Sequence, residues 1–216
     1  MPRSLSRLAR VVAVVAAAAV AAAVAADAAT AQTPAPQPPL ASFVAQRLIV
    51  LPVQLLRADS GAFVDAARWG AFRRELDNSI GSAIAARGVG KRWAYAADVV
   101  RSARRNAAYT SDPYALGAQP MRAVPIKPGE KLPELFISNL RALIALGDTR
   151  YALLPIELVF RRSGSEQRAA LRLALVDGRA GLFVWLGEVV SDPAATLTPA
   201  IVTSLAARVA DLVAAP

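Results

Sequence analysis

The sequence predicts an α/β fold in which about four helices cover one mixed sheet, and two observations indicate it. The first is the order of the expected elements: strand, helix, strand, helix, loop, helix, three successive strands and a closing helix. This order is typical of helices packed on a sheet, and successive strands favour an antiparallel meander. The second is residues 168–191, where apolar side chains alternate on both sides of a turn that begins at Asp177. We therefore expect a C-terminal antiparallel hairpin at the centre of the sheet.

The first elements are a buried strand and an amphipathic helix. Residues 47–56, RLIVLPVQLL, are mostly apolar, and Pro52 is expected at a bulge or near a strand end, because proline donates no ladder hydrogen bond. Asp65 can cap the helix that follows. The apolar side chains of this helix recur at steps of three and four: Trp69, Phe72, Leu76, Ile80 and Ile84. A short strand over 92–96 and a second helix over 97–108 are expected next.

Residues 109–132 form the irregular part of the chain, since they contain four prolines and two glycines. We expect a long loop with some extended pieces, and such loops are often functional or mobile. This loop and the end of the preceding helix are the first candidates for a partner-binding surface. The candidate residues are Arg101, Arg104, Arg105, Tyr109, Tyr114, Lys127 and Lys131.

The last elements continue the same alternation. A third helix is expected over 133–147, and a strand over 151–162 with Pro155 at an edge or bulge. The closing helix begins with Thr198 as N-cap and Pro199 at its first position.

Residues 1–31 have the three-part pattern of a secretory signal peptide. Three arginines precede an uninterrupted run of alanine and valine, and small residues follow. We expect cleavage after Ala31, with Ala28 as the alternative site. An uncleaved anchor is the competing interpretation, although the run is shorter than the roughly 20 residues that span a bilayer.

The predicted organisation after the signal peptide is simple. Residues 32–46, rich in proline and alanine, are expected to be a tether, and residues 47–216 a single α/β domain. No transmembrane span is expected after cleavage, so the predicted location is periplasmic or secreted.

The composition excludes several classes of chemistry. The chain has no Cys and no His, so disulfides, thiolate nucleophiles, histidine bases and the usual zinc and haem ligands are excluded. We expect no cofactor and no metal site. The net charge of +9 comes from scattered arginines rather than a dense stripe, which favours a solvated surface over a nucleic-acid site.

Carboxylates are the remaining acid or base candidates. Glu157 and Glu188 both lie in predicted strands and could approach one another as a glycosidase pair does. The simpler interpretation is that each faces outward from a solvated or edge strand. Asp177 is interpreted as a turn residue. We therefore predict that the protein is not an enzyme.

Aromatic side chains provide a second kind of candidate site. Trp93 and Tyr95 are expected to share one face of a short strand, and Phe183 and Trp185 one face of the hairpin. The main interpretation is that these rings belong to the core. If either face is uncovered, it forms a binding patch.

Three segments of the chain are similar to a known superfamily. They are LIVLPV at 48–53, ALGDTRYALL at 145–154 and ALVDGRAGLFVWLGEV at 174–189. They resemble the amino-terminal domain of TolB, the curli-secretion (CsgG-like) lipoproteins and the penicillin-binding-protein activator lipoproteins. The distinctive positions lie in the hairpin, at Asp177, Gly178, Gly181 and Trp185, and are expected to fix its turn and packing. The chain departs from that pattern because it has no lipobox cysteine. We also expect no following β-propeller, as in TolB, and no long amphipathic hairpins that could build a secretion barrel.

The resemblance and the excluded chemistry together predict a function class. The resemblance implies an envelope-facing scaffold or binding domain. We expect a non-enzymatic, exported cell-envelope protein that binds another envelope protein or self-associates. The alternatives are a carboxylate-dependent hydrolase of envelope polysaccharide and a carrier of small anionic ligands.

Overall fold

The computed structural model describes residues 37–59, 68–123, 125–195 and 198–215. The predicted signal peptide and the Asp65 cap lie outside the described residues. The compact unit begins at Pro38, not at the expected Arg47. Leu40 is 1% exposed and its N–H donates to the Leu212 carbonyl oxygen at 2.8 Å. The described part of the expected tether is therefore largely a segment of the folded domain, including the 3-10 helix η1 (Ala41–Phe43).

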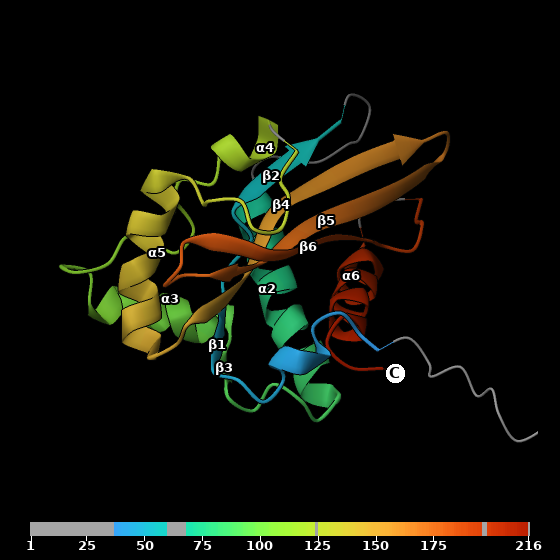
Figure 1. The fold of residues 1–216 in the computed structure, drawn as a ribbon. Coiled ribbons are helices and arrows are strands. Elements are labelled where there is room, and N and C mark those ends of the chain that lie inside the picture. The colour runs from blue at the N-terminus through green and yellow to red at the C-terminus, as the bar shows by residue number, and fades with distance from the viewer. Residues whose placement is uncertain (1–36, 60–67, 124, 196–197, 216) are drawn as a thin grey trace, which may run out of the picture. The chain divides into compact units, whose positions relative to one another are not determined.

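Six strands form one mixed sheet (Figure 1). They are β1 (Leu48–Val50), β2 (Leu55–Ala58), β3 (Trp93–Ala94), β4 (Tyr151–Ser163), β5 (Glu166–Asp177) and β6 (Leu182–Val190). The order is β3-β1-β4-β5-β6, and β2 pairs with β4 beyond the end of β1. The pairs among β1 to β4 are parallel, whereas β4, β5 and β6 form an antiparallel meander.

The α/β class and the meander are confirmed, but the expected position of the hairpin is wrong. The β5–β6 hairpin is not at the centre of the sheet, because β5 is the only described strand that pairs with β6, and β6 therefore lies at an edge. β4 is the central strand, with β1 and β2 paired along one side and β5 along the other. Alternating apolar residues indicate a strand with one apolar and one polar face, but they do not determine whether that strand lies at the centre or at the edge of the sheet.

Pro52 and Pro155 lie at points where the sheet needs no backbone N–H donor. Pro52 separates β1 from β2, between the Leu51 N–H, which donates to Leu153, and the Gln54 N–H, which donates to Pro155. The register of β4 against β5 shifts between Pro155 and Glu157, as a bulge does. The expected bulge at Pro155 is therefore present.

Helices cover both faces of the sheet. α2 (Trp69–Ala86) and α6 (Pro199–Asp211) contribute to one core cluster. α3 (Ala96–Arg105), the short α4 (Pro120–Ala123) and α5 (Glu134–Gly147) contribute to the other. None of the helices in the described ranges is long and apolar enough to span a bilayer.

The segment 109–132 is more ordered than a long loop. It contains α4, and Leu116, Met121 and Leu132 are all buried in the core on the α5 side. Tyr109, in contrast, is 82% exposed. Most of the segment therefore packs on the domain, and its exposed side chains lie at a few separate points.

Candidate functional site

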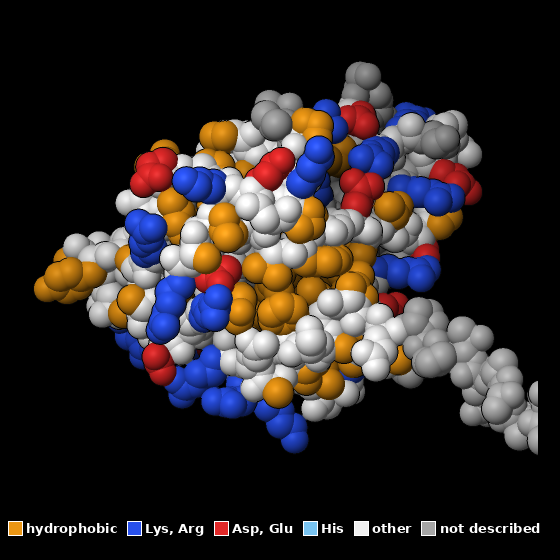
Figure 2. All heavy atoms as spheres, viewed as in Figure 1, with side chains coloured by type: hydrophobic (Ala, Val, Ile, Leu, Met, Phe, Trp, Pro, Cys, Tyr) orange, Lys and Arg blue, Asp and Glu red, His pale blue; other side chains and the backbone are white. Residues whose placement is uncertain are grey.

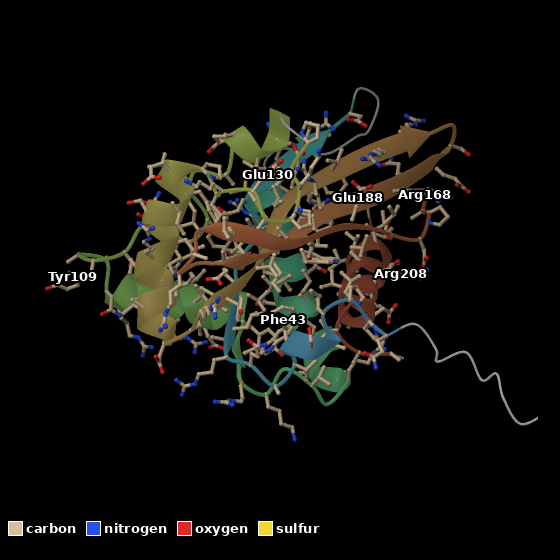
Figure 3. The ribbon with its side chains drawn as sticks, viewed as in Figure 1. Phe43, Tyr109, Glu130, Arg168, Glu188 and Arg208 are labelled. Carbon is tan, nitrogen blue, oxygen red and sulfur yellow. The ribbon has the colours of Figure 1, made fainter. Side chains whose placement is uncertain are left out.

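The structure does not bring the predicted partner-binding residues into one site. Arg101, Arg104 and Arg105 are exposed on α3, and Tyr109 extends from the chain beyond them (Figure 3). Lys127 and Lys131 are exposed in the segment that reaches the start of β6. The proposed surface is thus divided between the end of α3 and the β6 edge.

Tyr114 lies apart from both groups and belongs to a polar cluster near the β1–β2 connection. The Arg73 guanidinium carbon lies 4.5 Å from the centre of the Tyr114 ring. Burial, together with the nearby Asp77 carboxylate, raises the pKa of Tyr114 to about 12. A half-buried tyrosine with these neighbours is held by the fold rather than presented to a partner.

Asp77 is buried at the centre of this cluster. Its Oδ1 accepts the Val53 N–H at 3.0 Å, which fixes the chain between β1 and β2. Its Oδ2 is turned toward Tyr114, and none of the described residues forms a hydrogen bond of ordinary geometry with it. Burial raises the pKa of Asp77 to about 6, although the Val53 amide, Tyr114 and Arg73 each lower it. The sequence contains a sign of this burial, because Asp77 precedes Ile80 by three residues and Ile84 by seven.

Glu157 and Glu188 share the face of the sheet that α4 partly covers. Both pair in register with Arg172, so β5 lies between them at roughly 10 Å, twice the usual strand spacing. Glu157 is 5% exposed, with Arg122 Nε 2.6 Å from its Oε1, and the expected outward orientation of this residue is wrong. Glu188 is exposed and lies 3.4 Å from Arg161. Each carboxylate therefore has an arginine partner, an arrangement that favours a structural role.

Asp177 holds the hairpin turn. Its Oδ1 accepts the N–H groups of Arg179 and Ala180, both at 2.9 Å. Arg150 Nε donates to its Oδ2 at 2.7 Å. Burial raises the pKa of Asp177, but Arg150 and the two amides together bring it below its usual value. Gly181 has a φ of 70°, which favours glycine at the end of the turn.

The β6 strand presents a partly open edge. Ser191 N–H donates to Ala169 O at 2.8 Å, and the alternation of an antiparallel ladder then directs the backbone groups of Leu186, Glu188 and Val190 away from β5. No described residue pairs with these outward groups. Unpaired edge groups are a template for another strand.

The start of the same edge is already occupied by the chain itself. Phe183 N–H donates to Glu130 O at 3.0 Å, and Gly129 N–H donates to Phe183 O at 2.7 Å (Figure 3). Lys131 forms an antiparallel bridge with Leu182. The edge thus accepts an antiparallel segment as far as Phe183, and the remainder of β6 continues without one.

A bulge places the β6 aromatics on opposite faces. The register shifts where Trp185 pairs with Leu175 and Phe183 pairs with Val176, so that Val184 is the extra residue. Phe183 enters the core on the α5 side, whereas Trp185 packs on the α6 side. The expectation that these rings share a face is wrong.

Gly187 makes room for the Trp185 indole. A Cβ atom at Gly187 would lie 2.4 Å from Cζ2 and Cη2 of Trp185. The indole therefore lies along the strand, over the next residue on the same face. The sequence analysis did not consider Gly187, although a glycine inside an apolar strand can indicate such a close approach.

Hydrophobic side chains gather next to this edge. Figure 2 shows them between β6 and η1, and Phe43 of η1 is labelled at the same place in Figure 3. Half-buried residues packed against the core on this face include Phe43, Val44, Val184, Trp185 and Leu212. We define the β6 surface as the open backbone of Leu186, Glu188 and Val190 together with the Val184 and Trp185 side chains.

The chemistry of the described residues is limited. They contain no group of three or more Asp or Glu side chains arranged to hold a metal ion. The β6 surface offers backbone hydrogen bonds and apolar contact, which are the elements of protein recognition.

Comparisons with known proteins give distant similarities to solved structures. No family model matches the chain, and no curated protein matches it significantly. Two solved structures of PelC dodecamers from Paraburkholderia phytofirmans are similar, with 15% and 14% identity and TM-scores of 0.37 and 0.38. Each match covers 83% of this chain and 96% of that chain. Lipoprotein GNA1162 from Neisseria meningitidis has 16% identity and a TM-score of 0.38, covering 72% of this chain and 88% of that chain.

Proposed function

We propose that the protein is a non-enzymatic protein of the cell envelope, exported to the periplasm, whose β6 surface binds an extended segment of a partner protein. The observation that supports this proposal is the outward backbone of Leu186, Glu188 and Val190, which has no partner among the described residues. Such an edge pairs with an added strand, and its main-chain hydrogen bonds supply affinity.

The chain itself indicates the direction of the added strand. Residues 129–132 lie antiparallel along the start of β6, and a partner segment would continue that line past Phe183. Trp185 would contact the apolar side chains on one face of the segment. Half-buried aromatic residues of this kind are common anchors at protein interfaces.

Other observations support the remaining parts of the proposal. The export pattern of residues 1–31 and the resemblance to envelope lipoproteins favour the periplasm. The absence of Cys and His from the sequence, and the arginine partners of Glu157 and Glu188, favour binding over catalysis. The role is therefore that of a binding or scaffold domain.

A proline at position 188 tests the edge directly. Glu188→Pro removes an outward N–H while the ladder to β5 keeps its donors, and the preceding Gly187 has no Cβ to clash with the proline ring. Glu188→Gln is the matched control, because it also removes the Arg161 ion pair but keeps the N–H.

The readout is cross-linked affinity purification of the tagged protein from fractionated cells, with mass spectrometry of bound partners. We expect a stoichiometric envelope protein that is lost with Glu188→Pro and kept with Glu188→Gln. Thermal unfolding must show that both variants fold. Equal capture by both folded variants would contradict the edge, and capture that is lost only on charge reversal at Arg101 and Arg104 would place the surface on α3.

A further inference from the structure

A pocket of about 310 Å³ lies at the end of α5, away from the β6 surface. Its lining includes Arg141, Ile144 and Asp148 from the end of α5, Thr149 beyond it, and Gly178 and Arg179 from the hairpin turn. This volume is within the lower part of the range for small-molecule sites. Two elements far apart in the sequence thus form one concave site.

Arginine side chains outnumber aspartate side chains around this pocket. Arg47 pairs with Asp148, and Arg150 pairs with Asp177 below the turn. Asp148, which lines the pocket, and Asp177, which lies next to the lining residue Gly178, therefore each already have an arginine partner. The side chains of Arg141 and Arg179 have no ion pair or hydrogen bond within the described residues. Two positive charges remain uncompensated at the mouth of the pocket.

The Thr149 hydroxyl lies behind the pocket wall. Its Oγ1 is fully buried and has no hydrogen-bond partner in the described part of the chain. Because this oxygen does not reach the pocket surface, Arg141 and Arg179 are the side-chain donors that the lining offers to an anion.

The C-terminal end of α5 repels an anion less strongly than a helix end with free carbonyl groups would. The carbonyls of Ile144 and Ala145 accept the N–H groups of Thr149 and Asp148, at 3.1 and 3.2 Å. The negative end of the helix is thereby partly satisfied. Figure 2 shows Lys and Arg side chains gathered around this end of α5, at the lower left.

We propose that this pocket binds an oxyanion, the carboxylate or phosphate group of a small molecule or of a lipid headgroup, through Arg141 and Arg179. Guanidinium groups match the geometry of carboxylate and phosphate oxygens. The ion pair with Arg47 reduces the repulsion that Asp148 of the lining would exert on the ligand, and the ion pair with Arg150 does the same for the nearby Asp177. This site does not depend on the β6 surface, and either can fail without the other.

The test measures binding of three probes to the whole mature chain: inorganic phosphate, citrate, and vesicles of phosphatidylglycerol. Phosphate and citrate are titrated by calorimetry against chloride at matched ionic strength, and vesicles by co-sedimentation. The pocket variant is Arg141→Gln with Arg179→Gln. Its matched control is Arg104→Gln with Arg105→Gln, which removes the same charge from exposed positions on α3.

We expect saturable binding by the wild-type protein and the control, and at least tenfold weaker binding by the pocket variant. Binding to vesicles but not to citrate or phosphate would assign the oxyanion to a lipid headgroup, and the reverse to a small molecule. Equal binding by the pocket variant and the wild-type protein, an equal loss in the α3 control, or no saturable binding of any probe would overturn the proposal.

Discussion

Replacing Asp77 with asparagine removes a carboxylate that the fold buries at 5% exposure. The asparagine keeps an oxygen for the Val53 N–H, which Asp77 accepts at 3.0 Å, so the β1–β2 connection retains its hydrogen bond. The pKa of Asp77 rises from 3.8 to about 6 on folding. At about 1.4 kcal/mol per pKa unit, the folded state prefers the protonated carboxyl by about 3 kcal/mol.

The contribution of Asp77 to stability therefore depends on pH. Because the folded pKa of Asp77 is raised, its stabilising contribution is complete below pH 3.8 and is lost as the pH rises through about 6. The asparagine side chain that replaces it in the variant does not titrate. The free energy of unfolding of Asp77→Asn, minus that of the wild-type protein, should therefore increase by about 2.5 kcal/mol between pH 4 and pH 7.5, since Asp77 of the unfolded chain is already more than half ionised at pH 4.

Urea unfolding of the two proteins across this pH range measures the difference. Taking the difference cancels the other titrating carboxyl groups, including Asp177, whose lowered pKa contributes to stability with the opposite pH dependence. A difference that stays constant from pH 4 to pH 7.5 would refute the reasoning. It would mean that Asp77 is solvated or fully paired in the folded protein.

Two further predictions concern packing and buried charge. Gly187→Ala should displace the Trp185 indole, because the Trp185 Cζ2 would lie 2.4 Å from the new Cβ. Urea unfolding should show a free energy of unfolding lower by about 1–3 kcal/mol. Unchanged stability and unchanged Trp fluorescence would contradict this packing. Arg122→Ala should lower the free energy of unfolding by about 1–3 kcal/mol, because the Glu157 side chain is 6% exposed and, among the described residues, Arg57 at 3.8 Å is then its only ion-pair partner. The expected loss is smaller than for a fully buried ion pair, because the Arg122 side chain is 42% exposed. The double variant Arg122→Ala with Glu157→Gln should recover stability, which would show that the unpaired Glu157 carboxylate causes the loss.

Much of the fold could be predicted because apolar periodicity reports which residues face a core. The stripe from Trp69 to Ile84 predicted α2, and the alternation around Asp177 predicted the β5–β6 hairpin. The same alternation is expected of a central strand and of an edge strand covered on one face. The edge position of β6 depends on which strand lies beside it, and that is a tertiary property.

The features of the candidate site were harder to predict for a related reason. In a bulged strand, adjacent residues such as Val184 and Trp185 can both turn toward one core, so simple alternation assigns Trp185 the wrong neighbours. Glu157 was expected to face solvent because it is charged. Its burial depends on Arg122, 35 residues earlier in the chain, and no local pattern reports such a pair.

The most direct test of the proposed function is photo-cross-linking in cells from position 190. Val190 is 39% exposed on the open part of β6, and a photoreactive residue there should cross-link to one envelope protein, with the cross-link abolished by Glu188→Pro. The same photoreactive residue at Tyr109, which is 82% exposed but distant from this edge in Figure 3, is the control. Our account predicts a specific product from position 190 and none from position 109. A product from position 109 alone, or one from position 190 that persists with Glu188→Pro, would contradict it.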